Sequence, residues 1–299
     1  MNFQRGVDAT QVLLGSKHKV FVEGSSDEKI DPVVISELLK ENGLPQIEVR
    51  SMGGCDNVRS AAQALIHDHP SYYFLNDRDD QHQDIVEASW SNFPNPDTHN
   101  MLIWHKRELE NFFIDPDYIC KSKWLKVTPN TLRQRIIKEF NRRIFLDAAN
   151  LTLSALKRSI RIQFAPDFSN LAQFMTKADG ARILDESPEL EEKRNSFTTI
   201  FEKNKVNKIY SDFVLELSGG NLPLQYGSGN WIERMSGKEV FRSIAGSCFR
   251  VEAADGTILQ GKEQNKQIVK QLLELPLNQQ PHDFQLLVSL LENRIKISS

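Results

Sequence analysis

The chain has 299 residues, of which 39% are hydrophobic and 26% charged, ordinary proportions for a globular protein that is long enough for two domains. No apolar run approaches the roughly 20 residues that span a bilayer, and the amino-terminal stretch lacks an apolar signal core. Three widely scattered cysteines argue against a disulfide framework or a zinc knuckle. We therefore expect a cytoplasmic protein with no membrane association.

The net charge of −3 conceals an uneven distribution along the chain. Residues 1–120 hold 10 Lys and Arg against 20 Asp and Glu, a net charge of −10. Residues 121–163 hold 11 against 2, a net charge of +9, and residues 164–299 hold 16 against 18. An acidic first part next to a basic segment is typical of a metal site beside a groove for a polyanion.

The first 120 residues alternate between strand-like and helix-like patterns. Short apolar runs predict strands at 19–23, 46–50, 71–76 and 101–104. Helical spacing predicts helices at 27–42 and 56–67, while the polar segment 81–99 is typical of a loop or a short helix. This order favours an α/β fold with a mainly parallel sheet and helices on its faces.

Beyond residue 120 the pattern becomes mainly helical, with helices expected at 237–246, 261–275 and 283–296. We therefore predict two domains. The first spans residues 1–120 and the second, a mainly helical part, spans residues 121–299.

Three predicted strands are followed by acidic residues. The first ends at Glu23, before a glycine turn; the third is followed by Asp77, Asp79 and Asp80, and the fourth by Glu108 and Glu110. Because the carboxyl ends of parallel strands share one edge of a sheet, these carboxylates are expected to converge. The alternative is that the aspartates form a solvated turn and that the first glutamate caps a neighbouring helix.

Converging carboxylates repel one another, and a divalent cation removes that conflict. Hard oxygen ligands with open water positions suit Mg²⁺ or Mn²⁺. The sequence therefore predicts a metal centre around Glu23, Asp77 and Asp79 that orients water and polarises a phosphate. Glu108 and Glu110 lie two residues apart and would point in different directions on a helix, so the sequence does not decide which one faces the other acids.

The sequence resembles the TOPRIM family in three places. These are Val-Glu-Gly-x-x-Asp at 22–27, Gly-Gly at 53–54 and Asn-Asp-Arg-Asp-Asp at 76–80. The segment 106–116 is similar to the OLD-like branch of TOPRIM nucleases, and so, less specifically, is 236–240. Together these segments resemble the AriB family, the TOPRIM effectors of PARIS anti-phage defence systems. Where family members often carry a basic residue after the glycine pair, this chain has Cys55.

The resemblance implies a Rossmann-like TOPRIM domain in which Glu23, Asp77 and Asp79 surround Mg²⁺ and Glu23 takes part in proton transfer. It also implies a toxic effector that an ABC-type ATPase, AriA-like, holds inactive until infection. The released effector would cleave host RNA, with tRNA the implied target, and the sequence leaves open whether its active form is a homodimer. Two other interpretations stay open: an OLD-type DNA endonuclease, and a non-catalytic TOPRIM module that binds nucleic acid or a partner protein.

Several basic residues are candidates for binding nucleic acid. Lys106 and Arg107 flank the acids after the fourth strand, and Lys238 follows a glycine at a predicted helix start. Within the basic segment, three residues at helical spacing make one face positive: Arg135, Lys138 and Arg142. Each has a plainer interpretation, as a solvated lysine or arginine or as a docking face for an acidic partner.

Overall fold

The computed structural model describes residues 18–24, 26, 30–65, 67–95, 100–159, 182 and 186–298. The elements of the first half are β1 Lys19–Val22, α2 Ile30–Glu41, β2 Glu48–Ser51, α3 Cys55–Leu65, β3 Tyr72–Asn76, α4 Gln83–Asn92, β4 Met101–Ile103, η1 Leu109–Phe112, α5 Pro116–Ile119 and α6 Pro129–Ser159. Those of the second half are α8 Pro188–Ile200, α9 Lys203–Ser218, α10 Trp231–Arg234, α11 Gly237–Cys248, α12 Gly261–Leu273, η3 Leu277–Gln279 and α13 His282–Ser298.

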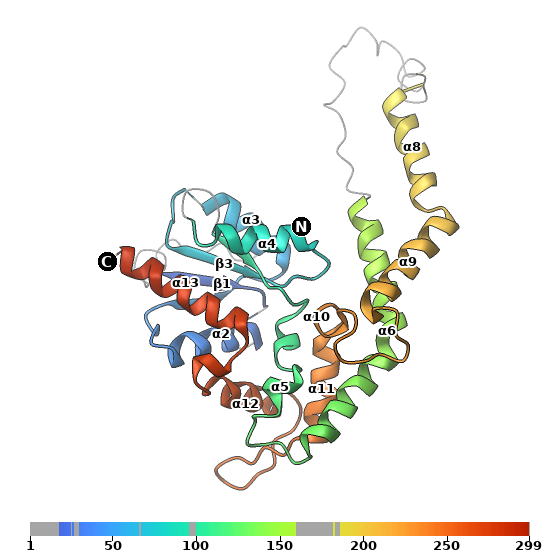
Figure 1. The fold of residues 1–299 in the computed structure, drawn as a ribbon. Coiled ribbons are helices and arrows are strands. Elements are labelled where there is room, and N and C mark those ends of the chain that lie inside the picture. Colours follow the sequence, from blue (N-terminus) through green and yellow to red (C-terminus); the bar gives the residue numbers. More distant parts are fainter. Residues whose placement is uncertain are drawn as a thin grey trace. The chain divides into compact units, whose positions relative to one another are not determined.

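The four strands form one parallel sheet in the order β2-β1-β3-β4 (Figure 1). Every residue of β1 and β3 is buried, as expected for the central strands of a parallel sheet with both faces covered. The predicted α/β architecture is therefore confirmed, and α4 occupies the segment in which we expected a loop or a short helix. The expected start of the first helix, at residues 27–29, lies outside the described residues.

Helices cover the sheet on both faces (Figure 1). On one face, Val58 and Ala62 of α3 pack against Phe21 and Phe74, because alternate residues of a strand point to the same side. On the opposite face lie α2 and α13, and α2 buries Leu38 completely. The carboxyl ends of the strands stay open between these layers, which is where parallel sheets hold their ligands.

The carboxyl-terminal segment returns to the sheet and completes its core. The ring of Phe284 in α13 lies 5.8 Å from Trp104 and 4.9 Å from Phe112, measured between centroids. The hydroxyl of Tyr118 donates a hydrogen bond to the carbonyl of Leu272 in α12, at 3.0 Å. Residues after 231 therefore belong to the same hydrophobic core as the strands.

The chain forms two compact units, one of residues 1–142 with 231–299 and one of residues 143–230. These units do not coincide with the predicted ranges 1–120 and 121–299, because the last helices pack on the sheet. The carboxyl-terminal part is helical, as predicted, and the second unit contains α8 and α9. Among the helices of the described ranges, none has the length and apolarity needed to cross a membrane.

Candidate active site

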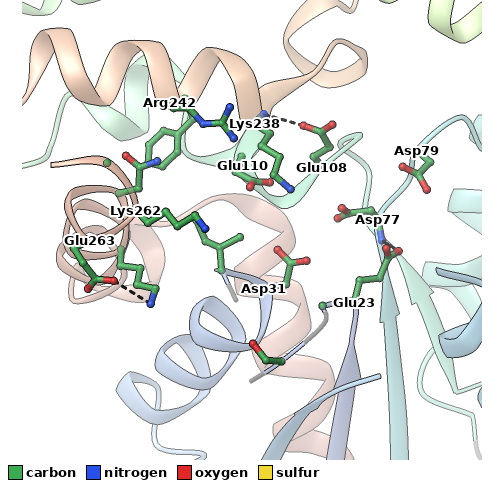
Figure 2. A pocket seen from close by; sticks show the side chains of 17 residues that line it. Glu23, Asp31, Asp77, Asp79, Glu108, Glu110, Lys238, Arg242, Lys262 and Glu263 are labelled. Carbon is green, nitrogen blue, oxygen red and sulfur yellow. Dashed lines mark hydrogen bonds and ion pairs between the residues drawn. The ribbon is translucent and has the colours of Figure 1, made fainter. Parts of the chain in front are cut away.

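A cavity of about 940 Å³ opens at the carboxyl ends of β1 and β3, within the unit of residues 1–142 and 231–299 (Figure 2). Its acidic lining residues are Glu23, Asp31, Asp77, Asp79, Glu108, Glu110 and Glu263. Its basic lining residues are Lys238, Arg242, Lys262 and Lys266. The structure thus brings five of the six predicted acids to one cavity. Asp80 is not among its lining residues.

Glu23 is held at the end of β1 by a backbone bridge between two glycine turns. The amides of Gly24 and Gly53 donate hydrogen bonds to each other's carbonyls, both at 2.8 Å. These glycines have φ values of 138° and 85°, which side chains disfavour. The amide of Asp77 donates to Oε1 of Glu23 at 3.2 Å. A hydrogen bond from the backbone amide of Asp77 therefore holds these two predicted ligands next to each other.

The turn after β3 carries Asp79 in a left-handed conformation, with φ 49°, which is uncommon for a residue other than glycine. Its amide donates to the carbonyl of Arg107 at 3.0 Å. The guanidinium of Arg78 donates to the carbonyl of His105 at 2.8 Å. These bonds tie the turn after β3 to the segment after β4. Strain of this kind, held by surrounding contacts, is often found where side chains must be aimed at a ligand.

Glu108 and Glu110 have different surroundings. The carboxylate of Glu108 accepts hydrogen bonds from the hydroxyl of Ser236 at 3.2 Å and from the amide of Lys238 at 2.8 Å, so it caps the start of α11. Glu110 is only 6% exposed and lines the cavity. Within the described residues, its carboxylate has no hydrogen bond or ion pair with another residue. Glu110 is therefore the member of this pair that is available to a cation.

The start of α11 is pressed against η1, and this contact places Lys238 at the cavity. A Cβ atom on Gly237 would lie 2.5 Å from Oδ1 of Asn111, so only glycine fits. Oδ1 of Asn111 accepts from the amide of Glu108 at 3.1 Å, and its Nδ2 donates to the carbonyl of Met235 at 2.9 Å. The Ser-Gly-Lys segment at 236–238 therefore packs closely against η1, although the two lie far apart in the chain.

The carboxylates of the cavity raise one another's pKa. Burial, and then the charge of Asp79, raises the pKa of Glu23 to about 7. Burial, and then the charges of Glu110 and Glu23, raises the pKa of Asp31 to about 8. Burial, and then Asp31 and Glu23, holds the pKa of Asp77 well above its usual range. Burial likewise raises the pKa of Asp79 and Glu110. The cavity therefore favours a binding partner that neutralises several carboxylates at once.

Asp31 is a member of the cluster that sequence reasoning missed. It lies in the first turn of α2 and faces the cavity between Glu23 and Glu110 (Figure 2). An acid in the first turn of a helix usually stabilises the helix through its dipole, so its presence there does not by itself indicate a binding site.

Cys55 also lies beside the predicted ligands. Among the residues that the structure describes, one ligand atom each from Glu23, Cys55 and Asp79 fall within 4.8 Å of one another, and Asp77 is not part of this group. Binding of one ion by all three predicted ligands therefore requires one of these side chains to rotate. Burial, and then the charge of Glu23, raises the pKa of the Cys55 thiol to about 12, so the thiol stays protonated and the donors are oxygens.

Two of the predicted basic residues are used in packing. The ammonium of Lys106 lies 5.1 Å from the centroid of the Phe112 ring and 3.5 Å from Oδ2 of Asp115. The guanidinium of Arg107 donates to the carbonyl of Arg234 at 3.4 Å. Neither residue lines the cavity, whereas Lys238 does.

The three predicted residues of α6 lie apart from the cavity lining. The guanidinium of Arg135 donates to the carbonyl of Ser247 at 2.7 Å and so anchors α6 to α11. Arg142 pairs with Glu139 at 3.4 Å, and Lys138 is exposed. This part of the basic segment is a separate surface, with one of its three cations committed to packing.

No protein-family model matches the chain, and neither does any curated protein. The geometry of the cavity therefore carries the functional argument, and the TOPRIM resemblance remains an expectation from the sequence.

Proposed function

We propose that this chain is a Mg²⁺- or Mn²⁺-dependent phosphodiesterase, a nuclease of the TOPRIM type. One observation carries the proposal. Carboxylates from the turn after β1, from α2, from the turn after β3 and from η1 meet in a single cavity that a lysine from α11 also enters (Figure 2). Acids that segments far apart in the chain bring together repel one another and so lower the stability of the fold. Clusters of this kind are common where a protein binds a cation.

The residues fit a hard divalent cation. Glu110 is a buried carboxylate with no partner residue among those described, and the pKa values of Glu23, Asp31 and Asp77 are all raised chiefly by burial. Oxygen donors of this kind are what Mg²⁺ and Mn²⁺ prefer. Glu23, Asp77 and Asp79 would hold such an ion, with Asp31 and Glu110 beside them. When bound, it would polarise a phosphate and lower the pKa of water.

Lys238 is the residue that would bind the phosphodiester. The ammonium of Lys238 stands near Glu110 and Asp31, where its charge lowers the pKa of both. It offers an N–H donor to a non-bridging phosphate oxygen. The Glu108 cap fixes the backbone of Lys238, so the ammonium stays at the cavity while its side chain adjusts.

From the sequence resemblance, we further propose that the substrate is host RNA, with tRNA favoured, and that the chain acts as a toxic effector in anti-phage defence. An ABC-type ATPase would hold it inactive until infection. The acidic cavity itself supports phosphodiester cleavage without distinguishing RNA from DNA. The choice between these substrates is therefore a matter for experiment.

The test is cleavage of tRNA and of duplex DNA by the purified chain with Mg²⁺ or Mn²⁺. Glu23→Ala should abolish cleavage, and Asp80→Ala is the control, because Asp80 lies in the turn that carries Asp77 and Asp79 but does not line the cavity. Cleavage of DNA alone would favour an OLD-type DNA endonuclease. Cleavage that survives in Glu23→Ala would contradict the assignment of the site.

A further inference from the structure

The cavity has a second wall, made of cationic side chains that no motif predicted. Arg242 comes from α11 and Lys262 from α12, and Figure 2 shows them across the cavity from Asp77 and Asp79. The first turn of α12 also borders the cavity, through Gly261 and its neighbours. This wall also holds Glu263, which pairs with Lys266 at 3.3 Å, so Lys262 and Arg242 supply its excess positive charge.

These two cations differ from Lys238 in what surrounds them. The charge of Lys238 lowers the pKa of both Asp31 and Glu110, whereas that of Arg242 lowers the pKa of Glu110 alone and by less, so Lys238 belongs to the acidic wall. Within the described residues, the ammonium of Lys262 has no hydrogen bond or ion pair. Arg242 pairs with Glu239 at 2.9 Å, and both side chains are exposed, so this ion pair is weak and its guanidinium can accept another partner.

We propose that Lys262 and Arg242 form an anion subsite that binds a second phosphate of a nucleic-acid strand, next to the phosphodiester that is cleaved. The inference rests on the proposed function and specifies its substrate. Ammonium and guanidinium groups are the side chains that proteins use to bind phosphate oxygens. A cavity of about 940 Å³ holds far more than one phosphate group. The substrate is therefore a strand with adjacent phosphates, and a phosphomonoester or a single nucleotide leaves this wall empty.

Two substrates separate the subsite from the cleavage site. Bis(4-nitrophenyl) phosphate is a phosphodiester with one phosphate, whereas an oligoribonucleotide decamer supplies neighbouring phosphates. Lys262→Ala and Arg242→Ala should each lower the ratio of kcat/KM for the decamer to kcat/KM for the small diester by about tenfold, the loss of one charge-assisted hydrogen bond. Lys270→Ala is the matched control, because Lys270 lies on α12 but pairs with Glu37 outside the cavity lining.

A binding measurement decides the inference independently of catalysis. In a Glu23→Gln background, the logarithm of decamer affinity is followed against the logarithm of salt concentration. Each lysine or arginine that contacts a phosphate contributes about 0.7 to the slope for a single strand, so Lys262→Ala and Arg242→Ala should each flatten the slope by about this amount.

The outcomes distinguish the two proposals. An unchanged slope and an unchanged kinetic ratio in Lys262→Ala and Arg242→Ala would overturn the subsite, even if wild-type chain cleaves both substrates. Equal losses on the two substrates would also overturn it, because the residues would then act at the cleaved phosphate. Failure of wild-type chain to cleave either substrate would refute the nuclease, while the slope would still decide the subsite.

Discussion

Glu23 should make the metal-free chain less stable as the pH rises. Its pKa lies at about 7, against 4.5 for an ordinary glutamate, because the carboxylate is buried and next because Asp79 repels it. Between these two values the folded chain retains a proton that the unfolded chain has released. The free energy of unfolding therefore falls as the pH rises through this window and levels off above the folded pKa.

The size of this effect follows from the shift. At about 1.4 kcal/mol per pKa unit, Glu23 alone lowers the free energy of unfolding by about 2 kcal/mol between roughly pH 5.5 and pH 8. His105 acts in the same direction, because its hydrogen bond with Asp283 raises its pKa above 6.5 and that contribution is lost as the pH rises through the raised value. In Glu23→Gln the His105 contribution remains, so the difference between the two pH profiles reports Glu23 together with the effect of its charge on Asp31 and Asp77.

The assay is urea unfolding in EDTA, followed by tryptophan fluorescence, at about pH 5.5 and pH 8 for wild type and Glu23→Gln. We expect the variant to lose about 2 kcal/mol less than wild type between these pH values. Added Mg²⁺ should stabilise wild type at the higher pH more than the variant, because a ligand of the folded state shifts the equilibrium by mass action. Two parallel pH profiles would refute the account of Glu23 as a buried, crowded carboxylate.

Three further changes test other parts of the site. Asp77→Asn should lower cleavage by more than about 100-fold, beyond the loss expected for a supporting residue, while far-ultraviolet circular dichroism stays unchanged. Gly237→Ala should destabilise the chain by about 1–3 kcal/mol in urea unfolding, because its Cβ would meet Asn111 at 2.5 Å. Lys138→Glu with Arg142→Glu should flatten the salt dependence of tRNA binding by up to about 0.9 per lost contact, and an unchanged slope would favour a solvated or partner-docking face.

The sequence predicts the parallel sheet and the acids after its strands because both depend on local patterns. Continuous apolar runs mark β1 and β3, and an acid directly after such a run must lie at the sheet edge. Glu23 and Asp77 therefore line one cavity, as the sequence predicted for the strand ends, whereas Glu110 enters it from η1.

The rest of the site depends on contacts between segments far apart in the chain. Lys262 reaches the cavity because α12 packs on α2, and no local pattern encodes that pairing. Lys106 turns away because Phe112 and Asp115 receive its side chain. Helical spacing places Arg135 on the same helix face as Lys138 and Arg142, but spacing alone does not show that Arg135 contacts α11. Composition likewise predicts a domain boundary at residue 120, because the charge content changes there. The hydrophobic core, however, continues across that position.

The return of the carboxyl-terminal segment leads to a last prediction about which part of the chain folds by itself. Phe284 is fully buried among aromatic rings of the sheet unit, and burial of a phenylalanine contributes about 3–5 kcal/mol. A fragment of residues 1–120 lacks that packing and should show no cooperative urea transition. The rings of Phe140 and Trp231 lie 4.9 Å apart, so the ends of the segment 143–230 are close enough to be joined.

Replacing that segment with a flexible linker of about six residues should leave a chain that unfolds cooperatively and binds Mg²⁺. Its Glu23→Gln version serves as the control for cation binding, because it lacks one expected ligand but keeps every contact of the aromatic core. A cooperative transition in the fragment 1–120 would mean that the strands need no support from α12 and α13. Loss of Mg²⁺ binding in a folded, linker-joined chain would mean that residues 143–230 contribute to the metal centre.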